Sequence, residues 1–351
     1  MLSTISPNQA LAAKAHAKFG KMLNDKNYQE LLACQSVTDV AAYLKAYTHY
    51  ADVFADMHDT NVHRGMLEER LRQKIFTEYA SLCRYELSGK YKLFPVIVMR
   101  FEIEQILHCL RLLKSGRPEE YLFVLPAFFD QHTKIDLYEL ARAESFEQVL
   151  SALEHTGYKK IIEPFAPHEG KVLNYIAVET ALYKYYYAYV NELIERHTAG
   201  SVRDELRQLY GIKAELSNLI TIIRLKQYYN AENDYIRSFL LPYRYHISDR
   251  ELEMLLNAES AEEVRKFILC NTRYGKVLGN HKPEYVEDSA GRIEYSYSKK
   301  LFRFSSNPTV IFAAFTVLTE IEVKNLITVI EGIRYHLSIN EISKMLIGVE
   351  V

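Results

Sequence analysis

The sequence contains no tryptophan, and it has only 13 glycines, 9 prolines and 4 cysteines in 351 residues. So few Gly and Pro residues leave few turns, which favours long helices joined by short loops. The cysteines are widely spaced without any C-x-x-C pattern, so we expect reduced core thiols rather than a zinc site or a disulfide framework.

Long apolar runs are also missing. The longest uncharged run, residues 304–319, is interrupted by Ser, Asn and Pro, and it falls short of the roughly 20 apolar residues of a membrane-spanning helix. Residues 1–14 lack the basic region and apolar core of a signal peptide. We therefore expect neither a signal peptide nor a transmembrane span.

An excess of charge of either sign is absent as well, because the formal net charge is only -2. This balance gives no electrostatic basis for binding nucleic acid. A hydrophobic content of 48% and a charged content of 25% are typical of a folded globular protein. At 351 residues the chain exceeds one ordinary core and suits two or three domains.

One short pattern occurs three times, in residues 102–110, 215–223 and 322–330. It consists of Glu, two variable residues, an amide side chain, two branched aliphatic residues, two variable residues and another aliphatic residue. The copies begin 113 and 107 positions apart. Apolar residues recur at three- and four-residue steps without proline, so each copy predicts a helix, and its wide apolar arc predicts that the helix is buried.

The polar positions of this repeat allow two interpretations. The cost of burying polar groups favours Glu and amide side chains that hydrogen-bond to neighbouring helices. Alternatively, these side chains line a cavity that receives a partner. Arginine follows the pattern directly in two copies, whereas Glu331 stands there in the third and Arg334 follows three residues later. The candidate partner contacts are Glu102, Gln105, Arg111, Glu215, Asn218, Arg224, Glu322, Asn325 and Arg334.

A second motif joins a serine to a Thr-x-Tyr over 13 or 14 positions, in residues 36–50, 145–158 and 260–274. Because serine is a favoured helix N-cap, each copy predicts two short helices separated at the Ser and a turn at the Thr-x-Tyr. A long helix follows in the first two copies, around residues 67–82 and 182–193. In the third, residues 274–307 are rich in Gly, Pro and charge, which predicts a long loop before a helix at 309–319.

Helix breaks are predicted at residues 115–118 and 229–232. With the repeats, they predict an all-α protein of three related helical domains of about 110 residues each. The expected boundaries are 1–118, 119–232 and 233–351. This period is far longer than the 20–50 residues of solenoid repeats, so a stack of hairpins is not expected.

The usual signatures of catalysis are missing. The sequence has no G-x-G-x-x-G, no P-loop and no G-x-S-x-G, and none of its 12 histidines follows a Glu at three residues' distance. We therefore expect no catalytic, cofactor-binding or metal-binding residues, and we do not expect an enzyme.

The order and spacing of these motifs resemble the C subunit of the rotary V-type ATPase or ATP synthase of bacteria and archaea, which is similar to the d subunit of the eukaryotic vacuolar proton pump. The resemblance covers nearly the whole chain. It rests on the segment 27–32 before the Ser-led helix, and on a C-terminal signature that runs from Asn307-Pro308 through Glu322 and Asn325-Leu326 to Arg334. Departures at Ile327, Ile333 and Tyr335 affect local contacts rather than the resemblance.

This resemblance implies a funnel of three domains in pseudo-threefold arrangement, bound peripherally at the cytoplasmic face of the membrane. Its socket would receive the central shaft and its base would sit on the proteolipid rotor ring, so that both turn together during ion transport or ATP synthesis. No cofactor, small-molecule substrate or nucleic acid is implied. An all-helical scaffold for soluble partners and an enzyme with an unrecognised pocket are the alternatives.

Overall fold

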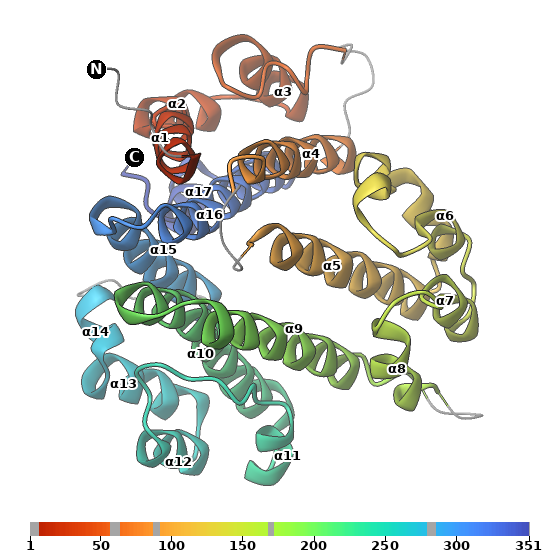
Figure 1. Cartoon of the computed structure of the whole chain (residues 1–351), viewed down its shortest axis with the longest axis vertical. Helices are drawn as coiled ribbons and strands as arrows, with labels where there is room; N and C mark the ends of the chain where they lie inside the picture. The colour runs from red at the N-terminus through yellow and green to blue at the C-terminus, as the bar shows by residue number, and fades with distance from the viewer. Residues whose placement is uncertain (1–6, 57–63, 87–91, 168–171, 279–285, 351) are drawn as a thin grey trace.

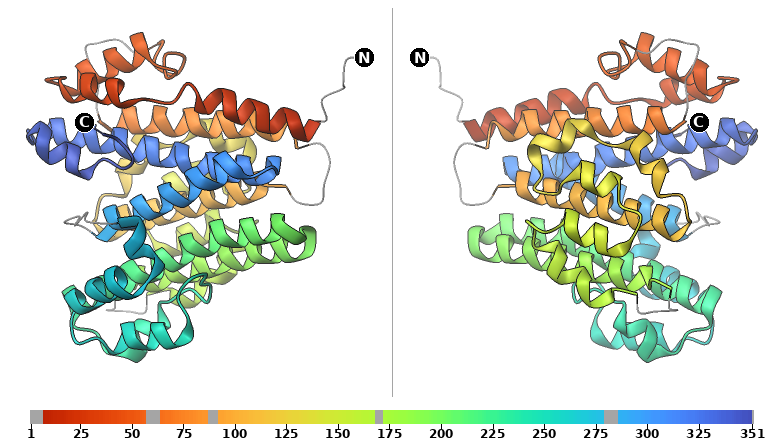
Figure 2. Two further views of the ribbon diagram at one scale, coloured as in Figure 1. Left: turned by 90° about the vertical axis from the view of Figure 1, so that its left-hand side faces the viewer. Right: turned by 90° about the vertical axis from the view of Figure 1, so that its right-hand side faces the viewer.

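A computed structural model describes residues 7–56, 64–86, 92–167, 172–278 and 286–350. Within these ranges the regular structure is helical and contains no strand, which confirms the all-α class. Six long helices run side by side through the middle of the molecule (Figures 1 and 2). They are α4 (Arg64–Cys83), α5 (Phe94–Lys114), α9 (Tyr175–His197), α10 (Gly200–Tyr229), α15 (Val286–Phe304) and α16 (Pro308–Arg334).

The shorter helices lie around this central group in three places, which Figure 1 shows at its top, right and lower left. The first place holds α1 (Pro7–Phe19), α2 (Asp25–Leu32) and α3 (Val37–Tyr47). The second holds η1 (Pro118–Val124), η2 (Ala127–His132), α6 (Leu137–Ala141), α7 (Phe146–Ala152), α8 (Tyr158–Ile162) and η3 (Glu163–Phe165). The third holds α11 (Asn233–Ser238), α12 (Asp249–Asn257), α13 (Ala261–Asn271) and α14 (Arg273–Leu278), while α17 (Ile339–Met345) follows α16.

The serine caps are confirmed in all three copies. Ser36, Ser145 and Ser260 have extended backbones, and their hydroxyls accept a hydrogen bond from the third backbone N–H of α3, α7 and α13 at 3.1, 3.3 and 3.2 Å. This bond satisfies one of the free N–H groups at a helix start. The two short helices therefore separate where the sequence predicts.

The turn at Thr-x-Tyr is confirmed as well. In each copy the threonine hydroxyl accepts the backbone N–H of the tyrosine at 3.2 Å. Helix breaks also occur at both expected junctions, where Gly116 (φ 71°) follows α5 and Asn230 (φ 43°) caps α10. A positive φ ends a helix, and Gly and Asn tolerate it best. The domain boundaries themselves stay a prediction.

The expected loop over residues 274–307 is wrong. Most of its described residues form α14 and the long helix α15, which precedes α16 as α4 precedes α5 and α9 precedes α10. Residues 279–285 of the expected loop lie outside the described residues. Gly291 was interpreted as part of a loop, but it lies inside α15, where it permits close packing. A Cβ added there would lie 2.4 Å from Ile347 Cδ1. The helix expected at 309–319 is likewise only the first part of α16, whose N-cap is Asn307.

The buried apolar side chains form two clusters. The larger joins α1 to α9 with α16 and with parts of α10 and α15, and the smaller joins α10 to α15 around Ile223 and Val264. The burial predicted for the repeated helices is confirmed most clearly in α16, where Phe312 and Phe315 are fully buried. No helix in the described ranges combines the length and the apolar character needed to cross a bilayer.

Candidate functional site: the repeated polar positions of α5, α10 and α16

The repeated glutamates are buried, and each binds a turn of the chain. Glu102 accepts hydrogen bonds from the hydroxyls of Thr133 (2.7 Å) and Tyr158 (2.6 Å). Glu215 accepts three consecutive backbone N–H groups, from residues 245–247 at 2.8 to 3.0 Å, together with the hydroxyl of Tyr274. A buried carboxylate with several donors is stable because its charge is hydrogen-bonded.

Glu322 repeats this arrangement across almost the whole length of the chain. Its carboxylate accepts the backbone N–H of Leu23 at 2.6 Å and the hydroxyl of Tyr50 at 2.8 Å, and His49 Nε2 lies 2.9 Å away. The tyrosine in each case belongs to the Thr-x-Tyr motif. In all three copies, burial and then the charge of the glutamate raise the pKa of this tyrosine, so the phenol keeps its proton and donates.

The amide positions are also buried and bonded. Asn218 exchanges two hydrogen bonds with the backbone of Leu241, at 2.7 and 2.9 Å, and Asn325 does the same with Ile347, at 2.9 Å for both. Gln105 instead accepts the hydroxyl of Tyr121 at 2.8 Å. The amides therefore hold neighbouring segments, as the first interpretation expects. Their use as partner contacts stays a prediction.

These contacts follow one order along the chain. The Glu of α5 binds the Thr-x-Tyr after α7, and the Glu of α10 binds the one after α13. The Glu of α16 has no later copy and binds the first one, Tyr50, after α3. Glu350 near the C-terminus also donates its backbone N–H to Asp25 at 3.1 Å. The end of the chain thus packs against its beginning.

The three candidate arginines are exposed at the C-terminal ends of these helices. Arg111 lies 3.4 Å from the hydroxyl of Tyr175, and Arg224 donates to Glu287 at 2.7 Å. Arg334 lies 3.8 Å from Glu331 and stacks near the ring of Tyr335. Because they are exposed, these arginines are accessible from solvent. The partner contact expected of them stays a prediction.

A charged cluster that the sequence interpretation missed joins the same helices. Arg100 Nη1 lies 2.5 Å from Glu320 Oε2, and Lys213 Nζ lies 3.1 Å from the same oxygen. Glu104 binds Arg100 at 3.3 Å, and Glu294 binds Lys213 at 3.2 Å. We call Arg100, Lys213 and Glu320 the central triad. The sequence does contain a sign of this triad, because each of its members stands two positions before a repeated glutamate.

The triad controls the ionisation of its members. Burial alone would raise the pKa of Glu320, but the charges of Arg100 and Lys213 outweigh it and hold that pKa below its usual value. Burial and Arg100 act to lower the pKa of Lys213, yet Glu294 and Glu320 raise it overall. All three groups therefore stay charged near neutral pH.

A central pocket of about 550 Å³ lies among α4, α5, α9, α16 and η1. Two of the candidate contacts, Gln105 and Arg111, line it, and so does Ile327 of α16. Charges of both signs surround it, with Arg64 and Arg72 among the cations and Glu68, Glu69, Glu104, Glu120 and Glu179 as the carboxylates. Burial raises the pKa of Glu179, while Arg111 and Arg224 act against that rise.

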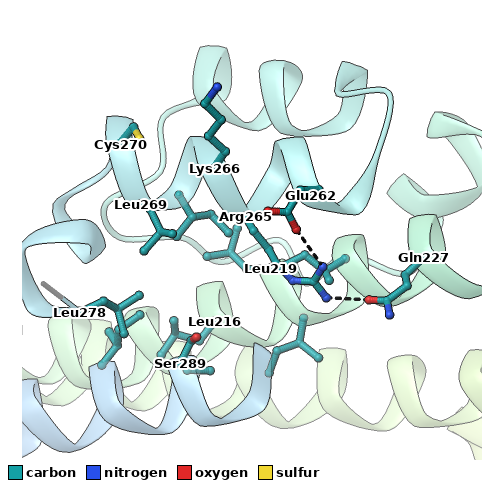
Figure 3. A pocket seen from close by; sticks show the side chains of 15 residues that line it. Leu216, Leu219, Gln227, Glu262, Arg265, Lys266, Leu269, Cys270, Leu278 and Ser289 are labelled. Carbon is teal, nitrogen blue, oxygen red and sulfur yellow. Dashed lines mark hydrogen bonds and ion pairs between the residues drawn. The ribbon is translucent and has the colours of Figure 1, made fainter. Parts of the chain in front are cut away.

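A second pocket, of about 560 Å³, lies between α10, α13, α14 and α15 (Figure 3). Leucine and isoleucine side chains such as Leu216 and Leu219 form its walls. At its rim Arg265 donates to Gln227 at 2.6 Å and lies 3.6 Å from Glu262. The thiol-bearing Cys270 at its edge is exposed, so only Cys109 of the four cysteines matches the expected core position.

Across the described ranges, no group of three His, Cys, Asp or Glu side chains is arranged to hold a metal ion. The fold and the repeated contacts define an all-helical protein in which buried polar side chains of α5, α10 and α16 bind neighbouring segments of the chain.

Comparison with known proteins identifies a family and relatives that this chain resembles. Residues 11–345 match the model of the family described as "ATP synthase (C/AC39) subunit". The chain is 26% identical to the C subunit of the A-type ATP synthase from Methanosphaera stadtmanae, over 90% of this chain and 80% of the relative. It is 25% identical to the protein of the same name from Methanocaldococcus jannaschii, over 99% of this chain and 88% of the relative.

The corresponding protein from Methanothermobacter thermautotrophicus, also named as the C subunit of an A-type ATP synthase, is 24% identical over 90% of this chain and 80% of the relative. Because the family match spans nearly all of the sequence, the chain belongs to the ATP synthase (C/AC39) subunit family. This confirms the resemblance stated from the motifs.

Proposed function

We propose that the chain is a non-catalytic central-stalk subunit of a rotary A/V-type ATPase, in which it joins the central shaft to the membrane proteolipid ring. The extent of the family match carries the proposal. It runs from residue 11 to residue 345 and so includes every repeated helix and the central pocket. The three relatives are each named as subunits of an A-type ATP synthase.

The central pocket supports this role as a place for a protein partner. It opens among long helices of the middle group, and charges of both signs surround it. In this proposal the exposed Arg111 and Arg224 contact the shaft, and the exposed Arg334 contacts the shaft or the ring. The six buried candidates, Glu102, Gln105, Glu215, Asn218, Glu322 and Asn325, act through the helices that they hold in place.

Stiffness is the second requirement of a protein that couples two rotating parts, because torque would otherwise be lost in deformation. Buried glutamates that tie the long helices to their neighbours restrict such deformation, and close packing transmits strain. The protein would be peripheral, at the cytoplasmic face of the membrane, and would need no cofactor of its own.

The test is a pull-down of the tagged chain from detergent-solubilised membranes of its host, followed by mass spectrometry. The proposal expects a coiled-coil shaft protein and the proteolipid ring to co-purify. The double variant Arg111→Glu/Arg224→Glu should recover less of the shaft, because two exposed cations are reversed. The control is Arg237→Glu, which changes an exposed arginine of α11 that pairs with Glu253 away from the pocket.

Recovery of soluble clients alone, with no ATPase component, would contradict the rotary role and favour the scaffold alternative. Saturable turnover of a nucleotide by the isolated chain would favour an enzyme instead.

A further inference from the structure

The central triad is built from one position of the repeat. Arg100, Lys213 and Glu320 each stand two residues before the repeated glutamate of α5, α10 and α16. The same carboxylate oxygen of Glu320 binds both cations, at 2.5 and 3.1 Å. The three copies of the repeat therefore meet directly at this level of the molecule.

A second set of equivalent positions does not meet. Arg111, Arg224 and Glu331 stand nine residues after the repeated glutamates, and thus 11 residues after the triad members. Eleven residues make about three helical turns, so both sets lie on nearly the same face of each helix. Among the ion pairs of the described residues, none joins two members of this second set; Arg224 binds Glu287 of α15 and Glu331 binds Arg64 of α4.

The triad also lies where the two hydrophobic clusters meet. Lys213 stands between Ile212, which belongs to the smaller cluster, and Ala214, which belongs to the larger one. Its second partner, Glu294, follows Ile293 of the smaller cluster. Arg100 and Glu320 lie on α5 and α16, which contribute to the larger cluster. The ion pairs of Lys213 thus run from one core to the other.

We propose that the central triad is the contact that closes the three repeat copies around their centre and couples the unfolding of the two hydrophobic cores. The side chains of Arg100, Glu320 and Lys213 are only 25%, 25% and 20% exposed. A cavity of about 20 Å³ is lined by all three and leaves room for about one water molecule. At this depth charges attract one another more strongly than at an exposed surface.

The signs of the charges fit this role. Three identical charges at equivalent positions around one centre would repel one another, whereas two cations around one carboxylate attract it. Only the third copy carries the acid at this position. The three copies are therefore not interchangeable, and Glu320 acts as a positioning residue for α5 and α10. This inference does not depend on the rotary role.

The test follows unfolding by urea in the full chain, with hydrogen exchange read by mass spectrometry in two regions. Residues 64–83 report on the larger core, and residues 249–271 report on the smaller one. In the unchanged chain both regions should lose protection at one urea concentration. In Glu320→Gln, residues 249–271 should lose protection at a lower concentration than residues 64–83.

Two further variants keep the test decisive. Lys213→Met retains the Arg100–Glu320 pair and much of the lysine's apolar bulk, and it should also separate the two midpoints, even if Glu320→Gln does not fold. Lys213→Arg retains the charge and should restore coincidence. The control Glu253→Gln removes an exposed pair between α11 and α12, which both belong to the smaller core, and should leave the midpoints together. Coincident midpoints in both Glu320→Gln and Lys213→Met, or separate midpoints in the unchanged chain, would overturn the proposal.

Discussion

The two ends of the repeated segment, residues 100–111, 213–224 and 320–331, carry the same pattern of charge and yet make different contacts. At residues 100, 213 and 320 the signs are plus, plus and minus, and at residues 111, 224 and 331 they are the same again. The first set converges on one carboxylate. In the second set each side chain instead contacts a different long helix, with Arg111 near Tyr175 of α9, Arg224 on Glu287 of α15 and Glu331 on Arg64 of α4.

This comparison shows that two sets of positions with the same charges, on nearly the same helix face, can make different contacts. The triad satisfies its charges inside the protein, whereas the two arginines of the second set lie beside the starts of the next long helices and stay exposed. One end of the three repeated segments is therefore joined by contacts within the protein, and the other leaves Arg111 and Arg224 accessible to a partner.

The largest effect on stability is expected from Glu322→Leu, at a residue of α16 that stands two positions after Glu320 of the triad. The change leaves the backbone N–H of Leu23 and the hydroxyl of Tyr50 without their acceptor. Because each buried unsatisfied group costs about 1–3 kcal/mol, we expect a loss of roughly 3 kcal/mol in the free energy of unfolding. Hydrogen exchange should show residues 25–47 losing protection first.

The exposed Glu30→Leu on α2, which pairs with Lys26 at 3.9 Å, is its control and should change stability little. Equal losses in the two variants would contradict the buried contact between the ends of the chain.

Gly291→Ala should have the next largest effect. Gly291 lies on α15, whose Glu294 pairs with Lys213 at the triad end and whose Glu287 pairs with Arg224 at the other end. The added Cβ would approach Ile347 Cδ1 to 2.4 Å. Overpacking of this kind costs about 1–3 kcal/mol. Thermal unfolding measures the loss. Gly20→Ala, where the nearest atoms would lie at 3.7 Å, should cost little; a tolerated Gly291→Ala would show that α15 can shift without disturbing either end.

Acid should weaken the triad end, because Glu320 loses its charge when it is protonated. The folded-state pKa of Glu320 is lowered, because Arg100 and Lys213 outweigh the opposing effect of burial. Its contribution to stability is therefore complete above the usual pKa of 4.5 and is lost as the pH falls through the lower folded value. The difference in urea midpoint between the unchanged chain and Glu320→Gln should shrink over this acidic range. A difference that stays constant would show that the charge of Glu320 is not the stabilising feature.

The smallest effect on stability is expected at the other end. Arg111→Gln and Arg224→Gln remove exposed charges, and exposed ion pairs contribute less than about 1 kcal/mol. Thermal unfolding should therefore be almost unchanged in both variants. A loss as large as that of Glu322→Leu would mean that these arginines hold the fold, and it would remove the contrast between the two ends.

Much of this architecture could be predicted, because periodicity and capping are local. The wide apolar arcs predicted the buried helices, and Ser36, Ser145 and Ser260 predicted where the short helices separate. The family was also predicted correctly from the order of the motifs. The loop expected after Tyr274 failed, because a glycine that permits packing looks the same in sequence as one that ends a helix.

The buried contacts could be predicted only in part. The repeated glutamates and the Thr-x-Tyr tyrosines were both recognised, but no local rule joins Glu322 to Tyr50 across 272 positions. The central triad was missed for a different reason. A search for repeats looks for identical residues, whereas Arg100, Lys213 and Glu320 work together because they differ in charge.

The contrast between the two ends is tested most directly by site-specific crosslinking within the assembled complex. A photoreactive amino acid would replace Arg111 or Arg224 at the accessible end, and Arg237 of α11 would be the control position. The account predicts crosslinks from positions 111 and 224 to the coiled-coil shaft protein, and none from position 237. An assembled complex in which the shaft is captured from position 237 but from neither 111 nor 224 would contradict it.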